Sequence, residues 1–487
     1  MASSGAGAAR KPKRQSVAIV GTGLAGLTAA YLLRNDDDQR YDVTLFEQAS
    51  SPADALSFDS ASVAVRDDKT GVVERIDLPM RACAGGYYAN LMRMYDYLGV
   101  PLHPVRFLFV FAKALASSAA AVSSPLGEAA RPEEAGSAPG SYFVHASNLH
   151  QTPPPWPGSR GVFAHVFEIL YLVVCQLWFS VACFLVPPAT GDGGHDGETL
   201  ADYLERVWLP RRYVSHYLLP LMSSVSTCDH ADMLAFPASD VVNYKRLSHG
   251  QQHYAVCGGV HQVQSRLVRG MRDIRLGCRV VCVETGDGGV LVRWQRGAGE
   301  AEEERFDRVV LAVSPDVAAR VFSPLSAALG KMPTRWVESS VLSPRPGAFS
   351  VTNADLSETC AHHRDDRSPS QVITFRSVFG DGAHTEALHA MPGGVLVSTL
   401  PLRSVEDKAV LKAAGFTRTL RTPASRAATR RVMGEGAASD GRAHWVNGEG
   451  GVWLAGSWCW DGMVLLEGCV VSAMRVADDL GVRIPWR

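Results

Sequence analysis

The sequence predicts an α/β fold, in which a domain built on a buried parallel sheet is interrupted by a second, mixed α+β domain. The apolar, β-branched run at residues 17–20 is typical of a buried parallel strand. A glycine-rich turn and a small-residue helix follow it directly, and a second apolar strand at residues 43–46 ends on Glu47. Strand and helix patterns alternate at both ends of the chain, around a central block of different character. This arrangement indicates one domain interrupted by another.

The turn after the first strand has the pattern G-x-G-x-x-G, formed by Gly21, Thr22, Gly23, Leu24, Ala25 and Gly26. In this pattern the second glycine lets the backbone approach a pyrophosphate, and the third lets helix and strand pack closely. The N-terminus of the helix offers N–H groups and a partial positive charge to phosphates. Glu47, followed by Gln48, can accept hydrogen bonds from ribose hydroxyls and argues against a 2′-phosphate. The pattern predicts a dinucleotide site, and a glycine-rich turn without a ligand is the alternative.

The composition is that of a large globular protein of 487 residues, 46% of them hydrophobic. The 48 basic and 49 acidic residues nearly cancel, so nothing indicates nucleic acid as a partner. The ten cysteines form no C-x-x-C pair and no metal spacing, which is typical of reduced core cysteines in an intracellular protein. We therefore predict no metal site, and a location in the cytoplasm or at the surface of an intracellular membrane. Residues 1–15 are expected to be a flexible tail.

Periodicity predicts most of the remaining elements. Strands are expected at residues 62–66, 72–77, 105–111, 142–144, 274–284, 290–294, 306–313 and 451–455. Helices are expected at residues 87–98, 200–222 and 465–480, with a helix after Gly258-Gly259 and a loop followed by a helix at 236–250. Residues 114–140, rich in Ala, Ser, Pro and Glu, are expected to be a mobile excursion. The region 336–430 shows alternating strands and loops with few motifs.

Residues 169–186 form an apolar stretch with Gln176 and Ser180 as its polar interruptions. Its length is at the short end for crossing a bilayer. A full span would place the first strand on one side of the membrane and later parts of the same fold on the other, which disfavours it. Two alternatives stay open. The stretch is a buried core helix, or it dips into one leaflet or lines an apolar entrance and gives affinity for a membrane surface or a lipid.

Several further segments carry a family resemblance. Residues 274–283 are similar to a strand whose valine, here Val280, holds an adenine through its backbone, and residues 306–312 to a strand that returns to the dinucleotide at Ala312. Residues 453–456 and 466–473 resemble a C-terminal motif that contacts a flavin ring and ribityl chain. Together with the opening motif, these pieces resemble the flavin-containing amine oxidase superfamily, and within it the predicted NAD/FAD-binding oxidoreductases.

The resemblance implies a Rossmann-like FAD-binding domain of the amine oxidase and glutathione reductase type. It would comprise residues 16–104, 249–313 and 445–487, with a substrate domain at residues 105–248 and 314–444. The implied cofactor is FAD, bound non-covalently because no family-type attachment cysteine is recognisable. Besides the turn at 21–26, Glu47 and Gln48, the implied cofactor contacts are Val280, Ala312, Gly456, Asp461, Leu466 and Glu467.

The implied activity is transfer of a hydride from an apolar substrate, a lipid or an amine, to flavin N5. No residue is assigned as a catalytic base. His253 and the tryptophans Trp458 and Trp460 could face the site or be structural, and His362-His363 is expected to be solvated. An NAD-dependent dehydrogenase is the less favoured enzyme.

Two departures from the family pattern support an alternative from another class, a catalytically degenerate dinucleotide-binding protein with a structural or scaffold role. Residues 50–57 lack the glycine pair usual after the acid, and in residues 77–81 Pro79 replaces a glycine.

Overall fold

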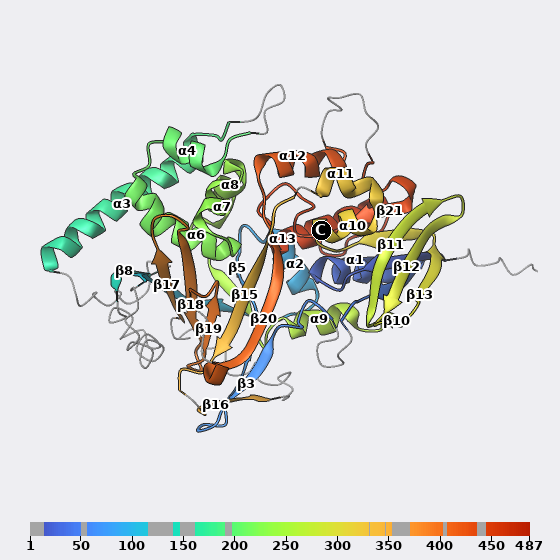
Figure 1. The fold of residues 1–487 in the computed structure, drawn as a ribbon, viewed down its shortest axis with the longest axis horizontal. Helices are drawn as coiled ribbons and strands as arrows, with labels where there is room; N and C mark the ends of the chain where they lie inside the picture. The colour runs from blue at the N-terminus through green and yellow to red at the C-terminus, as the bar shows by residue number, and fades with distance from the viewer. Residues whose placement is uncertain are drawn as a thin grey trace, which may run out of the picture.

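The computed structural model describes residues 14–49, 56–114, 140–146, 161–189, 197–330, 332–345, 347–352, 371–402, 407–435 and 445–487. Figure 1 shows two sheet-centred parts, which are linked by crossings of the chain. The predictions for residues 1–13, most of 114–140, most of the 50–57 turn and His362-His363 lie outside the described residues.

A five-stranded parallel sheet has the order β10-β2-β1-β14-β21. Its strands are β1 (Gln15–Val20), β2 (Tyr41–Phe46), β10 (Asp273–Arg275), β14 (Arg308–Leu311) and β21 (Val452–Leu454). Side chains of β1 alternate between two cores: Val17 and Ile19 face α1 (Leu24–Arg34) and α13 (Leu466–Asp479), while Ala18 and Val20 face the opposite layer. Both faces of the sheet are therefore covered, which explains its uninterrupted apolar strands.

The second layer of this part is an antiparallel sheet, β11-β12-β13, packed with α10 and α11. Its elements are β11 (Cys278–Gly286), β12 (Gly289–Arg296), β13 (Ala301–Phe306), α10 (Pro315–Val321) and α11 (Ser326–Leu329). Helix α9 (His261–Val268) packs against α1 on the other side. Segments from the beginning, middle and end of the chain thus build one α/β part.

A seven-stranded sheet with the order β20-β15-β19-β18-β17-β7-β8 forms the other part. Its strands are β7 (Phe107–Lys113), β8 (Ser141–Ala146), β15 (Thr334–Leu342), β17 (Gln371–Val378), β18 (His384–Ala390), β19 (Leu396–Thr399) and β20 (Val410–Thr419). Neighbours are antiparallel except β7 and β17, which run parallel.

Two three-stranded sheets and several helices complete the described chain. The sheets are β16 (Phe349–Thr352), β3 (Val63–Asp67) and β4 (Val73–Ile76), and β5 (Ala82–Ala84), β9 (His253–Val256) and β6 (Leu102–Val105). The helices are α2 (Ala89–Tyr97), α3 (Val162–Leu185), α4 (Leu200–Arg206), α5 (Arg211–Tyr213), a π-helical turn (Val214–Leu218), α6 (Leu219–Ser226), α7 (His230–Leu234), α8 (Ala238–Ser248) and α12 (Pro423–Val432). Short 3₁₀ turns lie at Ser323–Leu325, Asp407–Ala409 and Glu449–Gly451.

The structure corrects three element predictions. The expected strand 274–284 divides into β10 and β11, which lie in different sheets, because Gly277 adopts φ +68° and turns the chain. The expected helix 200–222 is broken at residues 207–210, where Trp208 has φ +60° and Pro210 follows. Helix α12, in a region expected to hold strands and loops, begins with a capping box at Thr422 and a proline at its first turn.

Helix α3 is longer and more exposed than expected. It begins at Val162, and it is the one described helix long and apolar enough to cross a membrane. Only 28% of the most apolar 18-residue stretch of α3 is buried. Figure 1 shows the helix along the outer edge of the molecule. The buried-helix alternative for residues 169–186 is therefore wrong, because one stripe of the helix packs on the protein while its other sides stay exposed.

His389 on β18 makes stability depend on pH. Its ring is 3% exposed and lies within 2.7 Å of the Gln371 amide oxygen, and burial lowers the pKa of its imidazole from 6.5 to about 4. The imidazole of His389 therefore binds a proton more readily in the unfolded chain than in the folded one. The contribution of the neutral ring to the free energy of unfolding is complete above pH 6.5 and is lost as the pH falls toward 4. Between pH 6.5 and 5 this loss is about 2 kcal/mol.

We expect His389→Gln, which stays neutral, to lose less thermal stability than the wild type between pH 7 and pH 5. Melting midpoints across this range measure the difference, and His249→Gln, which changes an exposed ring on the C-terminal end of α8, is the control. Parallel pH profiles for wild type and His389→Gln would contradict the assignment.

Candidate functional site

The predicted dinucleotide residues meet at the carboxyl edge of the parallel sheet. The glycine turn follows β1, Glu47 follows β2, Ala312 follows β14 and Gly456 follows β21. Backbone hydrogen bonds hold these ends in register: the Gly21 N–H donates to the Phe46 carbonyl over 2.9 Å, and the Ala312 N–H to the Val20 carbonyl over 2.9 Å. Ligands of open α/β sheets bind in the crevice outside such strand ends.

The three glycines of the turn have different surroundings. A Cβ on Gly26 would lie 2.1 Å from the Gly21 carbonyl oxygen, and one on Gly21, which has φ +100°, would lie 2.5 Å from the Ala312 oxygen. These two positions are filled by protein. Among the described residues, a Cβ on Gly23 would meet nothing closer than the Ser57 hydroxyl at 3.9 Å, and none of their side chains caps helix α1 at this end. The open space at Gly23 and the uncapped helix N-terminus fit a pyrophosphate.

Glu47 is 4% exposed and is held by the turn it faces. One carboxylate oxygen accepts from the Thr22 N–H over 3.3 Å and from the Thr22 hydroxyl, and the other accepts from the Ala49 N–H over 3.0 Å. The Ser57 N–H donates to the same Thr22 hydroxyl over 2.9 Å. The described end of the 50–57 turn therefore lies beside the glycine turn, as a segment covering the dinucleotide would.

A cavity of about 310 Å³ adjoins the acid at the sheet edge, lined by Gln48, Gly277, Arg279, Gln295 and Gly297. The Cys278 N–H donates to the Glu47 carbonyl, so β11 begins directly beside the end of β2. Val280 pairs with Trp294 before a bulge in β11, and its side chain is buried in the second layer. The cavity lies where an adenosine held between Glu47 and β11 would reach.

The N-terminus of α13 closes the opposite side of the glycine turn. Leu466 is its first residue, and burial raises the pKa of the Cys469 thiol in its first turn to about 11. Glu467, the second residue of α13, is 2% exposed. It accepts from the Asn90 N–H, the Asn90 side-chain amide and the Leu91 N–H over 2.7–3.0 Å, and so caps α2.

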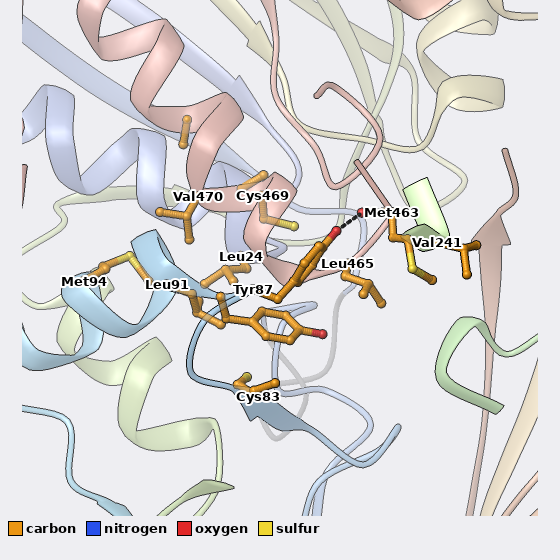
Figure 2. Close-up of a cluster of buried hydrophobic side chains, with 14 of the residues drawn as sticks. Leu24, Cys83, Tyr87, Leu91, Met94, Val241, Met463, Leu465, Cys469 and Val470 are labelled. Atoms are coloured by element: carbon orange, nitrogen blue, oxygen red, sulfur yellow. Dashed lines mark hydrogen bonds between the residues drawn. The ribbon is translucent and has the colours of Figure 1, made fainter. Parts of the chain in front are cut away.

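Next to this helix end lies an apolar cluster, which we call the ring-side cluster (Figure 2). Its members are 9% exposed or less: Leu24, Cys83, Tyr87, Tyr88, Leu91, Met463, Leu465 and Cys469. The Tyr87 hydroxyl donates to the Met463 carbonyl over 3.4 Å. By the family resemblance this is the side on which a flavin ring would lie, and it offers an apolar wall with tyrosine hydroxyls as its polar groups.

The turn between β21 and α13 is held by residues that sequence reasoning missed. The Arg421 guanidinium, 1% exposed, donates to the carbonyls of Trp458, Trp460 and Gly462. Asp240, also 1% exposed, lies 3.7 Å from it. Sequence carries no signal for this pair, because arginine and aspartate are usually exposed.

The other candidates in this turn have structural partners. Asp461 forms an ion pair with Arg426 over 2.7 Å. Gly456 donates its N–H to the Ser472 hydroxyl, and Trp458 donates to the Val313 carbonyl from a buried position. Trp460 donates to the Met463 carbonyl and lies edge-on to Tyr87. The tryptophans therefore pack the turn, and Trp460 also borders the ring-side cluster.

The altered segment at residues 77–81 connects neighbouring elements. Asp77 accepts the Val260 N–H with both carboxylate oxygens at 3.1 Å, and Gly259, at φ +77°, leaves room for that carboxylate. Arg81 donates to the Phe58 carbonyl over 2.9 Å.

His253 packs edge-on against Phe107 in the substrate part. Among the described residues, no group of three His, Cys, Asp or Glu side chains could hold a metal ion.

Comparison with known proteins agrees with this geometry. Residues 19–98 match the family model of NAD(P)-binding Rossmann-like domains, and residues 214–341 match that of flavin-containing amine oxidoreductases. No curated protein matches the chain. Similar solved structures include cyclohexylamine oxidase from Brevibacterium oxydans IH-35A, at 14% identity and a TM-score of 0.51 over 96% of this chain and 100% of that one. They also include a fatty acid isomerase from P. acnes that produces CLA, at 12% identity and a TM-score of 0.53 over 98% of this chain and 100% of that one.

At these identities the structures show the fold alone, and the two family models match two separate segments of the chain. The mixed α/β architecture with a Rossmann-like part is confirmed, and the matched family implies a flavin cofactor. The two matched segments and the shared fold make the chain similar to flavin amine-oxidase-like oxidoreductases.

Proposed function

We propose that the chain binds FAD non-covalently and oxidises an apolar substrate, a lipid or a non-polar amine, by removing a hydride. The observation that carries the proposal is the open space at Gly23, between an uncapped helix N-terminus and the buried carboxylate of Glu47. A pyrophosphate at Gly23 would be bound by backbone N–H groups, and Glu47 would accept from the ribose. FAD, when bound, supplies a hydride acceptor at flavin N5.

The chain's own residues would bind and orient the substrate. The ring-side cluster presents apolar side chains and the hydroxyls of Tyr87 and Tyr88, and burial raises the pKa of both phenols above their ordinary range. Such a wall excludes water and favours an apolar substrate. It contains no group placed as a base, and hydride removal by a flavin does not require a protein nucleophile. The names of the two similar proteins, which refer to a fatty acid and to cyclohexylamine, support the same substrate classes.

The purified full chain should show the absorbance of oxidised flavin and release free FAD on denaturation. Colourless protein that takes up no FAD on reconstitution would refute the proposal. Anaerobic addition of unsaturated fatty acids or apolar amines should then bleach the bound flavin in a single turnover. Reduction by dithionite is the control that the flavin can be reduced.

One observation favours the second candidate, a protein that keeps a dinucleotide for structure without turnover. The members of the ring-side cluster pack against one another, and Leu465 and Cys469 are 8% and 9% exposed. A flavin ring on this side would have to displace some of them. This candidate predicts protein that retains FAD and gains thermal stability from it, but whose flavin is bleached by dithionite and by none of the substrates.

A further inference from the structure

Helix α3 has its polar and apolar sides reversed relative to an ordinary surface helix. Its one charged residue, Glu168, points inward, where it accepts two hydrogen bonds from Arg212 over 2.7 and 2.8 Å and one from the Tyr217 hydroxyl. His165, also buried, stacks on Phe143. A surface helix in water normally turns its charged side outward. The outward side of α3 is therefore built for an apolar environment.

The outward side is a continuous apolar stripe at helical spacing. Eight large apolar residues of the helix are more than half exposed: Val162, Phe163, Phe167, Leu170, Val173, Val174, Leu177 and Leu185. The helix has 24 residues, which corresponds to a stripe about 36 Å long. The two exposed hydrogen-bonding side chains along the described helix are engaged: the Gln176 amide oxygen accepts from the Tyr213 hydroxyl, and the Trp178 indole donates to the Val207 carbonyl. An exposed apolar patch of this length marks an interaction surface.

Both ends of α3 are fixed to the same face of the protein. Near its N-terminus His165 contacts β8, and at its C-terminus Arg246 of α8 donates to the Cys183 and Phe184 carbonyls. Helix α8 also packs along α3. A helix held along its length in this way cannot cross a bilayer, so α3 can meet a membrane only by lying in its surface.

We propose that α3 lies in the plane of one leaflet of a zwitterionic bilayer and holds the protein at the membrane surface. Acyl chains require no hydrogen bonds, whereas protein interfaces carry about one per 100–200 Å². The large apolar residues of α3 that are more than half exposed are all Val, Leu or Phe and carry no hydrogen-bonding group, so the outward stripe suits lipid better than a second copy of the chain.

Two features beside α3 support lipid as the occupant. Trp178 donates its indole N–H to the Val207 carbonyl. Trp208, which follows Val207 in the chain, is 87% exposed and has φ +60°. Tryptophan favours the boundary between acyl chains and headgroups. Two nearby cations are paired, Arg212 with Glu168, and Arg206 with Glu198 over 2.6 Å. Because these two pairs carry no net charge, they give no attraction to anionic lipid, and we expect binding to vesicles that lack it.

The location of α3 relative to the candidate site agrees with a substrate drawn from lipid, a point that rests on the proposed function. Helix α8 lies between them: it packs on α3, and its Tyr244 lies 4.8 Å from Tyr87 of the ring-side cluster, ring centroid to ring centroid. A membrane against α3 would therefore lie one helix away from the cluster.

Flotation of the full chain with phosphatidylcholine vesicles tests the proposal, since any other part of the protein that covers α3 is then present. We expect the wild type to float with these vesicles without added phosphatidylserine. The double variant Val174→Glu/Leu177→Glu should float at least tenfold less, with an unchanged melting midpoint because both side chains point outward. Val72→Glu, at a 61% exposed valine between β3 and β4, is the matched control and should float like the wild type.

Three results would overturn the proposal. The wild type could remain at the bottom of the gradient, or the double variant could float as well as the wild type. In the third, the wild type would form a concentration-dependent dimer without lipid and the double variant would stay monomeric. That result would assign the stripe to an interface with a second copy of the chain. Flavin absorbance of the same protein reports on the proposed cofactor separately, so colourless protein that floats would refute the function and keep the membrane surface.

Discussion

Gly23→Val is expected to abolish FAD binding while leaving the fold intact. The described part of the chain leaves room for the side chain itself, since a Cβ there lies 3.9 Å from its nearest described neighbour, Ser57 Oγ. Gly23 also has φ −65°, which a branched residue can adopt. The branched group would instead fill the space required by the pyrophosphate and block the N-terminus of α1. We expect binding to weaken at least about 100-fold, which corresponds to about 2.7 kcal/mol.

The chain offers a matched control in Gly161, the N-cap of α3, which has φ −64° and nothing within 4 Å of an added Cβ. Gly161→Val places the same side chain at the same position of another helix and should retain FAD. Equilibrium titration with FAD and melting curves of both variants measure the two effects. A Gly23→Val variant that binds FAD normally would show that the phosphates are misplaced, and one that unfolds would show that the space is structural.

The opening unit could be predicted because it is local. Strand, glycine turn, helix, strand and acid are contiguous in sequence, and each has a distinctive residue pattern. The structure places Glu47 beside Thr22 and Ala312 beside Gly21, as that unit requires. The cofactor contacts suggested for these residues stay predictions.

Other features depend on distant contacts and escaped prediction. The apolar run at 169–186 predicted a helix, but not which side would pack, and the inward turn of Glu168 depends on Arg212 and Tyr217 far along the chain. Strand β13 was missed because its residues 302–304 are all glutamates, which are depleted in strands, yet β12 pairs with it. In the C-terminal motif, the cofactor contact of Glu467 stays a prediction, and sequence did not indicate that its carboxylate caps α2 through Asn90 and Leu91.

Arg421→Met is expected to give the largest loss of stability among single substitutions near the site. The guanidinium of Arg421 is buried and satisfies three carbonyls of the turn between β21 and α13. Burial raises the pKa of the Asp240 carboxyl, and Arg421 and Arg426 oppose that rise. Methionine keeps much of the volume but leaves Asp240 without its buried partner and three carbonyls without donors. Breaking a buried pair in this way costs about 3–5 kcal/mol.

We expect the melting midpoint of Arg421→Met to fall by about 3–5 °C, because the unfolding entropy of a chain of this size is about 1 kcal/mol/K. The double variant Arg421→Met/Asp240→Asn removes both charges and should recover at least about 1 kcal/mol of this loss, because buried partners do not act additively. Arg320→Met, which breaks the exposed pair with Asp316, is the control and should cost less than about 0.5 kcal/mol.

The same substitution should also weaken FAD binding, because the turn held by Arg421 leads to Leu465 and the N-terminus of α13. A structural role elsewhere in the fold would lower the melting midpoint without changing the affinity of the folded protein for FAD. Titration of Arg421→Met well below its melting midpoint separates the two roles. If the affinity is unchanged there while the midpoint falls, Arg421 stabilises the chain but does not position the C-terminal side of the site.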